Sequence, residues 1–289
     1  MKNNAPLVSK DTLIPFVLLT ICFAAWGVAA NMTDPLVKVF SKIFTMSSLQ
    51  SALVQFAYYG AYFCLAIPAA FINKRFSYKT GVLTGLGCAA AGAFLFYPAS
   101  QTMTYGFFLA ALFVLAGGLS ILETSANPYV MAMGNQKSAT RRLNLAQAFN
   151  PVGTNLGVFL AATLILPNLN QASAQERAAM SVSELKNVIG AELDAVMLPY
   201  VGMACVLVLV WVAIFLIKAP IQESVESSVE DVKLGASLKR LVANKHYRFG
   251  VLAQFFNVGA QTCVWTFTIQ YAMKATGGNE VSGGEILQY

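Results

Sequence analysis

Seven long apolar runs dominate this sequence and restrict what it can fold into. They lie at Leu13–Thr33, Leu49–Ile72, Gly81–Ala99, Tyr105–Met133, Leu143–Leu166, Met197–Ile217 and Phe249–Met273. A helix needs about 20 mostly apolar residues to cross the hydrocarbon core of a bilayer. None of the runs alternates like a strand of an outer-membrane barrel. With 57% hydrophobic and only 11% charged residues, the chain also has too little polar surface for a soluble protein. We therefore predict an all-α polytopic membrane protein.

The first run resembles a signal peptide only superficially. Its apolar stretch exceeds the 7–15 residues usual for such a peptide, and six further runs follow it, so we expect an uncleaved helix. With the N-terminus in the cytoplasm, the inside segments hold 14 of the 19 Lys and Arg residues. This positive-inside bias predicts a cytoplasmic N-terminus. The basic residues are divided among short loops, and we expect no nucleic acid as a partner.

The spacing of the runs predicts three parts. Six runs precede the longest inside connection and one follows it, which indicates a six-helix bundle at 1–217, a cytoplasmic linker at 218–247 and the start of a second bundle at 248–289. Because one helix cannot enclose a pathway, we expect the chain to be truncated at its C-terminus. The charged outside segment 167–196 is expected to be a solvated loop.

Enzyme chemistry has little support. All five cysteines fall within predicted spans without a CxxC pair, and there is one histidine. These features predict no catalytic residues, no metal site and no cofactor other than a proton. No Lys or Arg lies within an apolar run, and those near run ends are expected to reach out to water.

Two acids lie within the predicted spans. Asp34 is near the outer end of the first span, and Glu123 is deep in the fourth. An ionised carboxylate at the centre of a bilayer costs at least about 2.5–3.5 kcal/mol, so such residues usually face a protein-lined cavity. With no cation to pair with in the spans, each acid can relieve this cost by binding a proton. The alternative is a neutral acid that hydrogen-bonds to a neighbouring helix.

Carboxamides accompany the acids at helical spacing. Asn31 shares a face with Asp34, and Asn127 shares one with Glu123. Further amides recur along the fifth and seventh spans, at Asn144, Gln147 and Asn150 and at Gln254, Asn257 and Gln261. Such groups around a water-filled space would suit a hydroxyl-rich solute. Interhelical hydrogen bonding explains any one of these rows equally well.

Several motifs resemble those of a known family. They are the inside turn Asn73-Lys-Arg-Phe-Ser-Tyr-Lys-Thr-Gly81, the segment Leu122-Glu-Thr-Ser-Ala-Asn-Pro-Tyr129, the segment Arg142-Leu-Asn-Leu-Ala-Gln-Ala-Phe-Asn150, and the segments Val251-Leu-Ala-Gln-Phe255 and Val258-Gly-Ala-Gln-Thr262. Together with Asn31-x-x-Asp34 they resemble the L-fucose:proton symporter branch of the major facilitator superfamily. In the basic turn, Asn73 stands where an Asp is common.

The resemblance implies a fold and a function. The fold would have two six-helix halves, of which this chain holds the N-terminal half and the first helix of the second. The function would be import of L-fucose or a related monosaccharide with protons, by a monomer in the bacterial inner membrane. Glu123 and Asp34 would be the proton-coupling acids, and Asn31, Gln147 and Asn150 would lie around the sugar; Glu123, Asn127, Gln254, Asn257 and Gln261 complete the expected sugar site. Pro35 departs from the fucose pattern and could alter the helix beside Asp34.

Other functions remain open from the sequence. Glucose/galactose relatives tend to have a neutral residue at the position of Glu123, so the acid favours fucose over another hexose. A membrane sugar sensor that does not transport is a further alternative. A polytopic enzyme lacks visible catalytic groups, and a retinal protein would need a lysine within the last span, whereas Lys274 lies beyond it.

Overall fold

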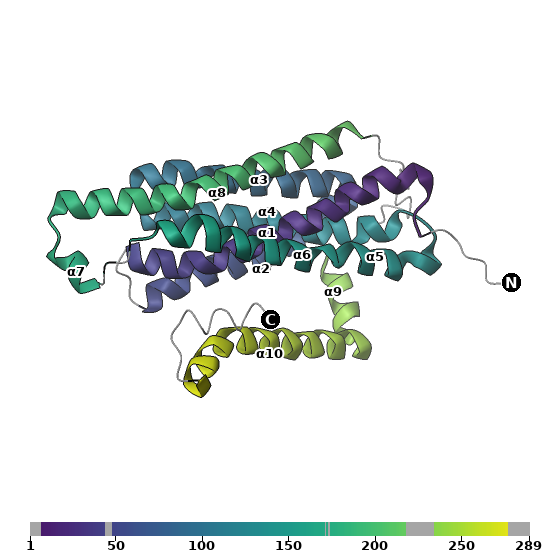
Figure 1. Ribbon diagram of the computed structural model, residues 1–289. Coiled ribbons are helices and arrows are strands. Elements are labelled where there is room, and N and C mark those ends of the chain that lie inside the picture. Colours follow the sequence, from purple (N-terminus) through teal and green to yellow (C-terminus); the bar gives the residue numbers. More distant parts are fainter. Residues whose placement is uncertain (1–6, 44–47, 171, 173, 218–233, 277–289) are drawn as a thin grey trace. The chain divides into compact units, whose positions relative to one another are not determined.

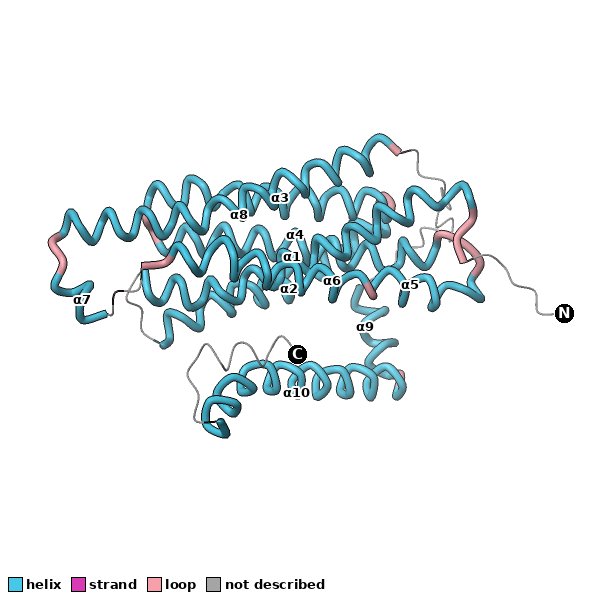
Figure 2. The backbone as a smooth tube through the Cα atoms, viewed as in Figure 1, coloured by secondary structure: helices cyan, strands magenta, loops and turns pink. Residues whose placement is uncertain are grey.

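The computed structural model describes residues 7–43, 48–170, 172, 174–217 and 234–276, and everything described is helix or connecting turn. The chain divides into two units, residues 1–225 and 226–289. In the first unit the long helices run side by side as one bundle (Figures 1 and 2). They are α1 (Leu13–Ile43), α2 (Ser48–Arg75), α3 (Tyr78–Thr102), α4 (Tyr105–Ala132), α5 (Ala139–Gln147), α6 (Phe149–Leu160) and α8 (Val182–Leu216), with the short α7 (Ala174–Ala179) before α8.

Six helical segments of the described chain are long and apolar enough to cross a membrane. Each overlaps one of the first six predicted runs, which confirms a multi-pass helical membrane protein. The seventh run falls within α10 (Lys245–Thr276) of the second unit, which follows α9 (Leu234–Ala243). That α10 crosses the membrane stays a prediction, as do the part boundaries expected at 217 and 247. Part of the expected linker, residues 218–233, lies outside the described residues.

Small residues let the helices of the first unit approach each other closely. A Cβ added to Gly153 of α6 would stand 1.9 Å from the carbonyl oxygen of Ala24 on α1. On α4, a Cβ at Gly118 would stand 2.2 Å from the backbone nitrogen of Ala89 on α3. Backbones at this separation leave no room for a side chain, which is the usual role of small residues at membrane helix interfaces. The pairs α1–α6 and α3–α4 are therefore held in fixed register.

The fifth run does not form one regular helix. It is divided at Ala148 between α5 and α6, and it ends in a π-helical turn, Ala161–Ile165. Pro151 has no backbone N–H to donate to the carbonyl of Gln147, and its ring crowds that carbonyl, which explains the break. By contrast, α1 continues past Pro35 to Ile43.

The predicted solvated loop at 167–196 is wrong in its second half. α8 begins at Val182, where Ser181 and Glu184 form a capping box. Glu192 and Arg177 form a buried ion pair, with 1% and 2% of their side chains exposed. The backbone N–H of Asn170 donates to Glu192 at 2.9 Å, and the Nε of Arg177 donates to the carbonyl of Ala172 at 3.3 Å. The pair thus ties the segment before α7 to α8.

We expect the loss of either partner of this pair to destabilise the protein. Glu192→Met or Arg177→Met leaves a buried charge without its partner, which costs about 3–5 kcal/mol, whereas the double substitution removes both charges and should cost less than either alone. Thermal unfolding in detergent is measured for four purified proteins: the unsubstituted protein, the two single variants and the double variant. Lys186→Met, on an exposed side chain of the same helix, serves as the control. Additive losses in the double variant would contradict this account.

Candidate proton and sugar site

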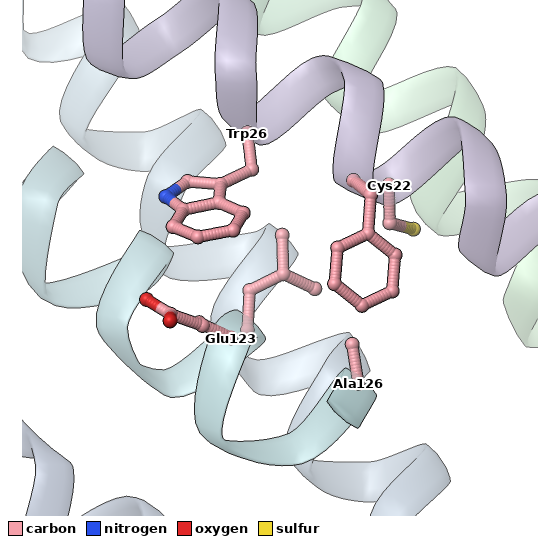
Figure 3. A pocket seen from close by; sticks show the side chains of 6 residues that line it. Cys22, Trp26, Glu123 and Ala126 are labelled. Atoms are coloured by element: carbon pink, nitrogen blue, oxygen red, sulfur yellow. The ribbon is translucent and has the colours of Figure 1, made fainter. Parts of the chain in front are cut away.

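Glu123 lies beside a narrow, mainly apolar crevice between α1 and α4. The crevice is lined by Cys22, Phe23, Trp26, Leu122, Glu123 and Ala126, whose side chains leave it too narrow to hold a water molecule. Figure 3 shows the carboxylate of Glu123 on the same side of the crevice as the indole nitrogen of Trp26, away from Cys22. Within the described part of the chain, nothing hydrogen-bonds to this partly buried carboxylate. It therefore lacks the neighbouring-helix partner that a purely structural acid would have, which favours the proton-binding interpretation.

Aromatic side chains of α1 and α2 pack against one another next to this crevice. The Nε1 of Trp26 donates to the hydroxyl of Tyr62 at 2.7 Å. Phe23 packs edge-on against Trp26 with ring centroids 6.4 Å apart, and Tyr58 lies 5.3 Å from Tyr62. The sequence offered many aromatic residues and no means of choosing among them. The structure selects Trp26, which lines the crevice with Glu123, and Tyr62, which is hydrogen-bonded to Trp26 from the neighbouring helix.

Asn31 lies at the α1–α6 interface. Its Nδ2 donates to the hydroxyl of Thr154 on α6 and to the carbonyl of Gly27, both at 3.0 Å. The donors of this amide are thus used between helices, as the interhelical alternative predicts. Thr154 was not among the predicted site residues. It lies four residues after Asn150, and that helical spacing was the available signal.

The amides of the fourth and fifth spans do come together. The Nε2 of Gln147 donates to the Oδ1 of Asn127 at 3.0 Å, with Gln147 exposed. The Nδ2 of Asn150 donates to the carbonyl of Phe23 at 3.4 Å. Because the helix breaks at Ala148, Gln147 and Asn150 contact different helices, α4 and α1. Because of this break, the amides of the fifth span contact two different helices, the same two that form the crevice beside Glu123.

The remaining predicted site residues stay predictions. Asp34 is in α1, but its side chain is outside the described part of the structure. Gln254, Asn257 and Gln261 share one side of α10, in the second unit. Their spacing on one helix is as predicted, and their part in a sugar site belongs to the proposal below.

Arg142 was expected to reach out to water and instead is fully buried, at 0% exposure. Its Nε donates to the carbonyl of Val130 at 3.0 Å and its Nη2 to that of Met131 at 2.6 Å. Its Nη1 donates to Ser138 Oγ at 2.8 Å, and also to the carbonyls of Leu7 and Asn135. The guanidinium thus caps the C-terminal end of α4, where helix carbonyls lack partners and a positive charge is favoured.

Comparison with known proteins agrees with this architecture. The chain is 42% identical to an L-fucose-proton symporter of Haemophilus influenzae over 287 residues, covering 96% of this chain and 66% of that protein. It is 41% identical to an L-fucose-proton symporter of Escherichia coli, covering 93% of this chain and 62% of that protein. A glucose/galactose transporter of Brucella abortus is 35% identical, over 89% of this chain and 58% of the relative. The chain thus spans slightly less than two thirds of these relatives.

Solved structures give the same result. A crystal structure of a Major Facilitator Superfamily transporter, FucP, in the outward conformation matches with a TM-score of 0.81 and 41% identity, covering 92% of this chain and 64% of that one. A crystal structure of the Escherichia coli fucose:proton symporter matches with a TM-score of 0.80 and 40% identity. The family model of the Major Facilitator Superfamily matches residues 17–284, which is nearly the whole sequence. The chain belongs to the Major Facilitator Superfamily.

Proposed function

We propose that this chain forms the proton- and sugar-handling part of a symporter that imports L-fucose or a related monosaccharide together with protons. The observation that carries the proposal is Glu123, a carboxylate that no described residue hydrogen-bonds, beside an apolar crevice. Relatives with 41–42% identity are named as L-fucose-proton symporters, against 35% for the glucose/galactose transporter.

The proposed mechanism couples two ligands through one equilibrium. Protonation of Glu123 removes a charge from a partly buried position. Sugar binding around it then favours the change between the outward- and inward-facing states of the transporter. Coupling requires each ligand to have different affinities for the inward- and outward-facing states. Asp34, Asn31, Asn127, Gln147 and Asn150 on the first unit, with Gln254, Asn257 and Gln261 on the second, are the proposed companions of Glu123 in proton and sugar binding.

The proposal also has a membrane orientation. Fourteen of 19 basic residues fall on one side when alternate connections are grouped, so we place the N-terminus in the cytoplasm, in a bacterial inner membrane. We propose a monomer with the sugar, protons and the lipid bilayer as its partners. Reaction of single-cysteine variants at Lys74 and Lys186 with a membrane-impermeant thiol reagent tests the orientation, since only the second should react in intact cells.

The symport itself is tested by proton uptake. We call the completed chain this sequence joined after Tyr289 to the part of the Escherichia coli symporter that this chain does not match. It is expressed in cells in a lightly buffered suspension. Addition of L-fucose should make the medium more alkaline, because protons enter with the sugar. The 289-residue chain is measured alongside.

Other outcomes select the other candidates. Alkalinisation by glucose or galactose and not by fucose would establish a hexose symporter of the kind that the Brucella abortus relative is named for. Sugar binding without any flux would indicate a sensor. Neither binding nor flux with a panel of hexoses would refute the sugar assignment.

A further inference from the structure

Tyr62 on α2 is held in place from both of the helices that form the Glu123 crevice. From α1, the indole N–H of Trp26 donates to its hydroxyl at 2.7 Å. From α4, the hydroxyl of Ser120 donates to the backbone carbonyl of Tyr62 at 3.3 Å. Its ring lies 5.3 Å from that of Tyr58, one turn earlier on α2. The hydroxyl therefore has a fixed position where α1, α2 and α4 meet.

These contacts also place the hydroxyl near Glu123. Ser120 is one turn before Glu123 on α4, so the Ser120–Tyr62 contact brings that turn of α4 against α2. Trp26, which holds the hydroxyl, itself lines the crevice, and the Glu123 carboxylate lies on the side of its indole nitrogen (Figure 3). The acid and the phenol therefore lie at the same junction of α1, α2 and α4.

The direction of the Trp26 hydrogen bond determines what Tyr62 can offer. An indole N–H is only a donor, so the Tyr62 oxygen is the acceptor in that bond. The hydroxyl of Tyr58 also hydrogen-bonds to this oxygen, and with Tyr58 as the donor the O–H proton of Tyr62 remains available for another acceptor. The Glu123 carboxylate is a strong acceptor that receives no hydrogen bond from the described residues.

We propose that Tyr62 is a positioning residue for the proton site, whose O–H donates to Glu123 whenever that acid is ionised. The inference rests on the proposed proton symport. A hydrogen bond to the charged form of an acid favours that form, so Tyr62 assists release of the proton. Among the described side chains, the other titratable groups at this site are Cys22, which lines the crevice with Glu123, and Tyr58 and Tyr59, which adjoin Tyr62 on α2; α6 has no titratable residue.

The test is the pH profile of sugar uptake in Tyr62→Phe. Uptake needs protonated Glu123 and therefore falls as the pH rises. Without the phenolic donor, the ionised form of Glu123 loses a hydrogen bond, so the acid keeps its proton to higher pH. The midpoint of the profile should therefore move upward by about one pH unit. Initial rates of radiolabelled L-fucose uptake by the completed chain measure this. Tyr97→Phe, which removes an exposed tyrosine hydroxyl on α3, should leave the midpoint unchanged.

A second variant separates positioning from a general structural effect. Trp26→Phe keeps an aromatic ring but removes the N–H that orients Tyr62. It should shift the midpoint in the same direction by a smaller amount, and the double variant should shift no further than Tyr62→Phe. An unchanged or lowered midpoint in Tyr62→Phe would overturn the inference while symport stands. Absence of fucose-driven alkalinisation in the unsubstituted completed chain would instead refute the proposed function.

Discussion

Replacing Glu123 with glutamine is expected to abolish fucose-driven alkalinisation by the completed chain while sugar exchange across the membrane continues. Glutamine has nearly the same shape and can hydrogen-bond to a hydroxyl group, but it carries no titratable proton. Sugar binding should therefore survive and coupling to the proton gradient should not. We expect proton uptake to fall by about tenfold or more, with exchange of labelled for unlabelled fucose within about threefold of the unsubstituted protein.

The control for this experiment is Asp194→Asn. Asp194 is an exposed acid on α8, so its neutralisation should change neither measurement. The comparison with Asp34→Asn then shows which of the two acids binds the transported proton. Wild-type alkalinisation in Glu123→Gln would exclude Glu123 from that role and leave Asp34 as the candidate.

Replacing Arg142 with methionine is expected to cause a large loss of stability in the first unit. The guanidinium satisfies carbonyls at the end of α4, including those of Val130 and Met131, and it also holds Ser138. Each buried polar group left without a partner costs about 1–3 kcal/mol, so the total should be on the order of 2–5 kcal/mol after some carbonyls recover water. Thermal unfolding of the purified completed chain in detergent measures this loss.

Two variants make the result specific. Arg141→Met removes the same charge one residue earlier, on an exposed side chain, and should be close to neutral. Arg142→Lys keeps the charge but replaces the planar fork of donors by a single ammonium, so its loss should be intermediate. Equal losses for Arg141→Met and Arg142→Met would show that net charge, and not the cap on α4, is responsible.

Transport should also respond to Arg142, through α5. Arg142 and Gln147 lie on the same nine-residue helix, so a change in how the arginine holds that helix to α4 changes the register of the Gln147–Asn127 hydrogen bond. This links the stability of one end of the bundle to the geometry of the amide row.

Most of the helical framework could be predicted from the sequence because its cause is local. The length of an apolar run, measured against the thickness of a bilayer, is enough to predict a spanning helix. The same reasoning failed where a helix extends beyond its apolar run. The start of α8 had a sequence signal, because Ser181 is followed three residues later by Glu184, the pattern of a capping box. Both residues are polar, so a search for apolar runs does not detect this signal.

The candidate site was predicted only in part, because its chemistry depends on contacts between helices. Glu123 was identifiable because an acid in an apolar run is costly wherever it faces. Asn31 gave the same polar signal, yet its donors are used by Thr154 and Gly27. A polar residue in a span thus reveals that it needs a partner, and not whether the partner is another helix or a substrate.

The sequence by itself determined that this chain is a bundle of membrane helices carrying an acid within its fourth span, since insertion energies depend on residue type and run length. Only the tertiary structure decided which polar groups are already satisfied. It buried Arg142 at the end of α4, paired Arg177 with Glu192, and linked Tyr62 to Trp26 and Ser120. Hydrogen bonds form between groups a few ångströms apart, and residues up to 168 positions apart in the chain meet this condition only after the helices pack.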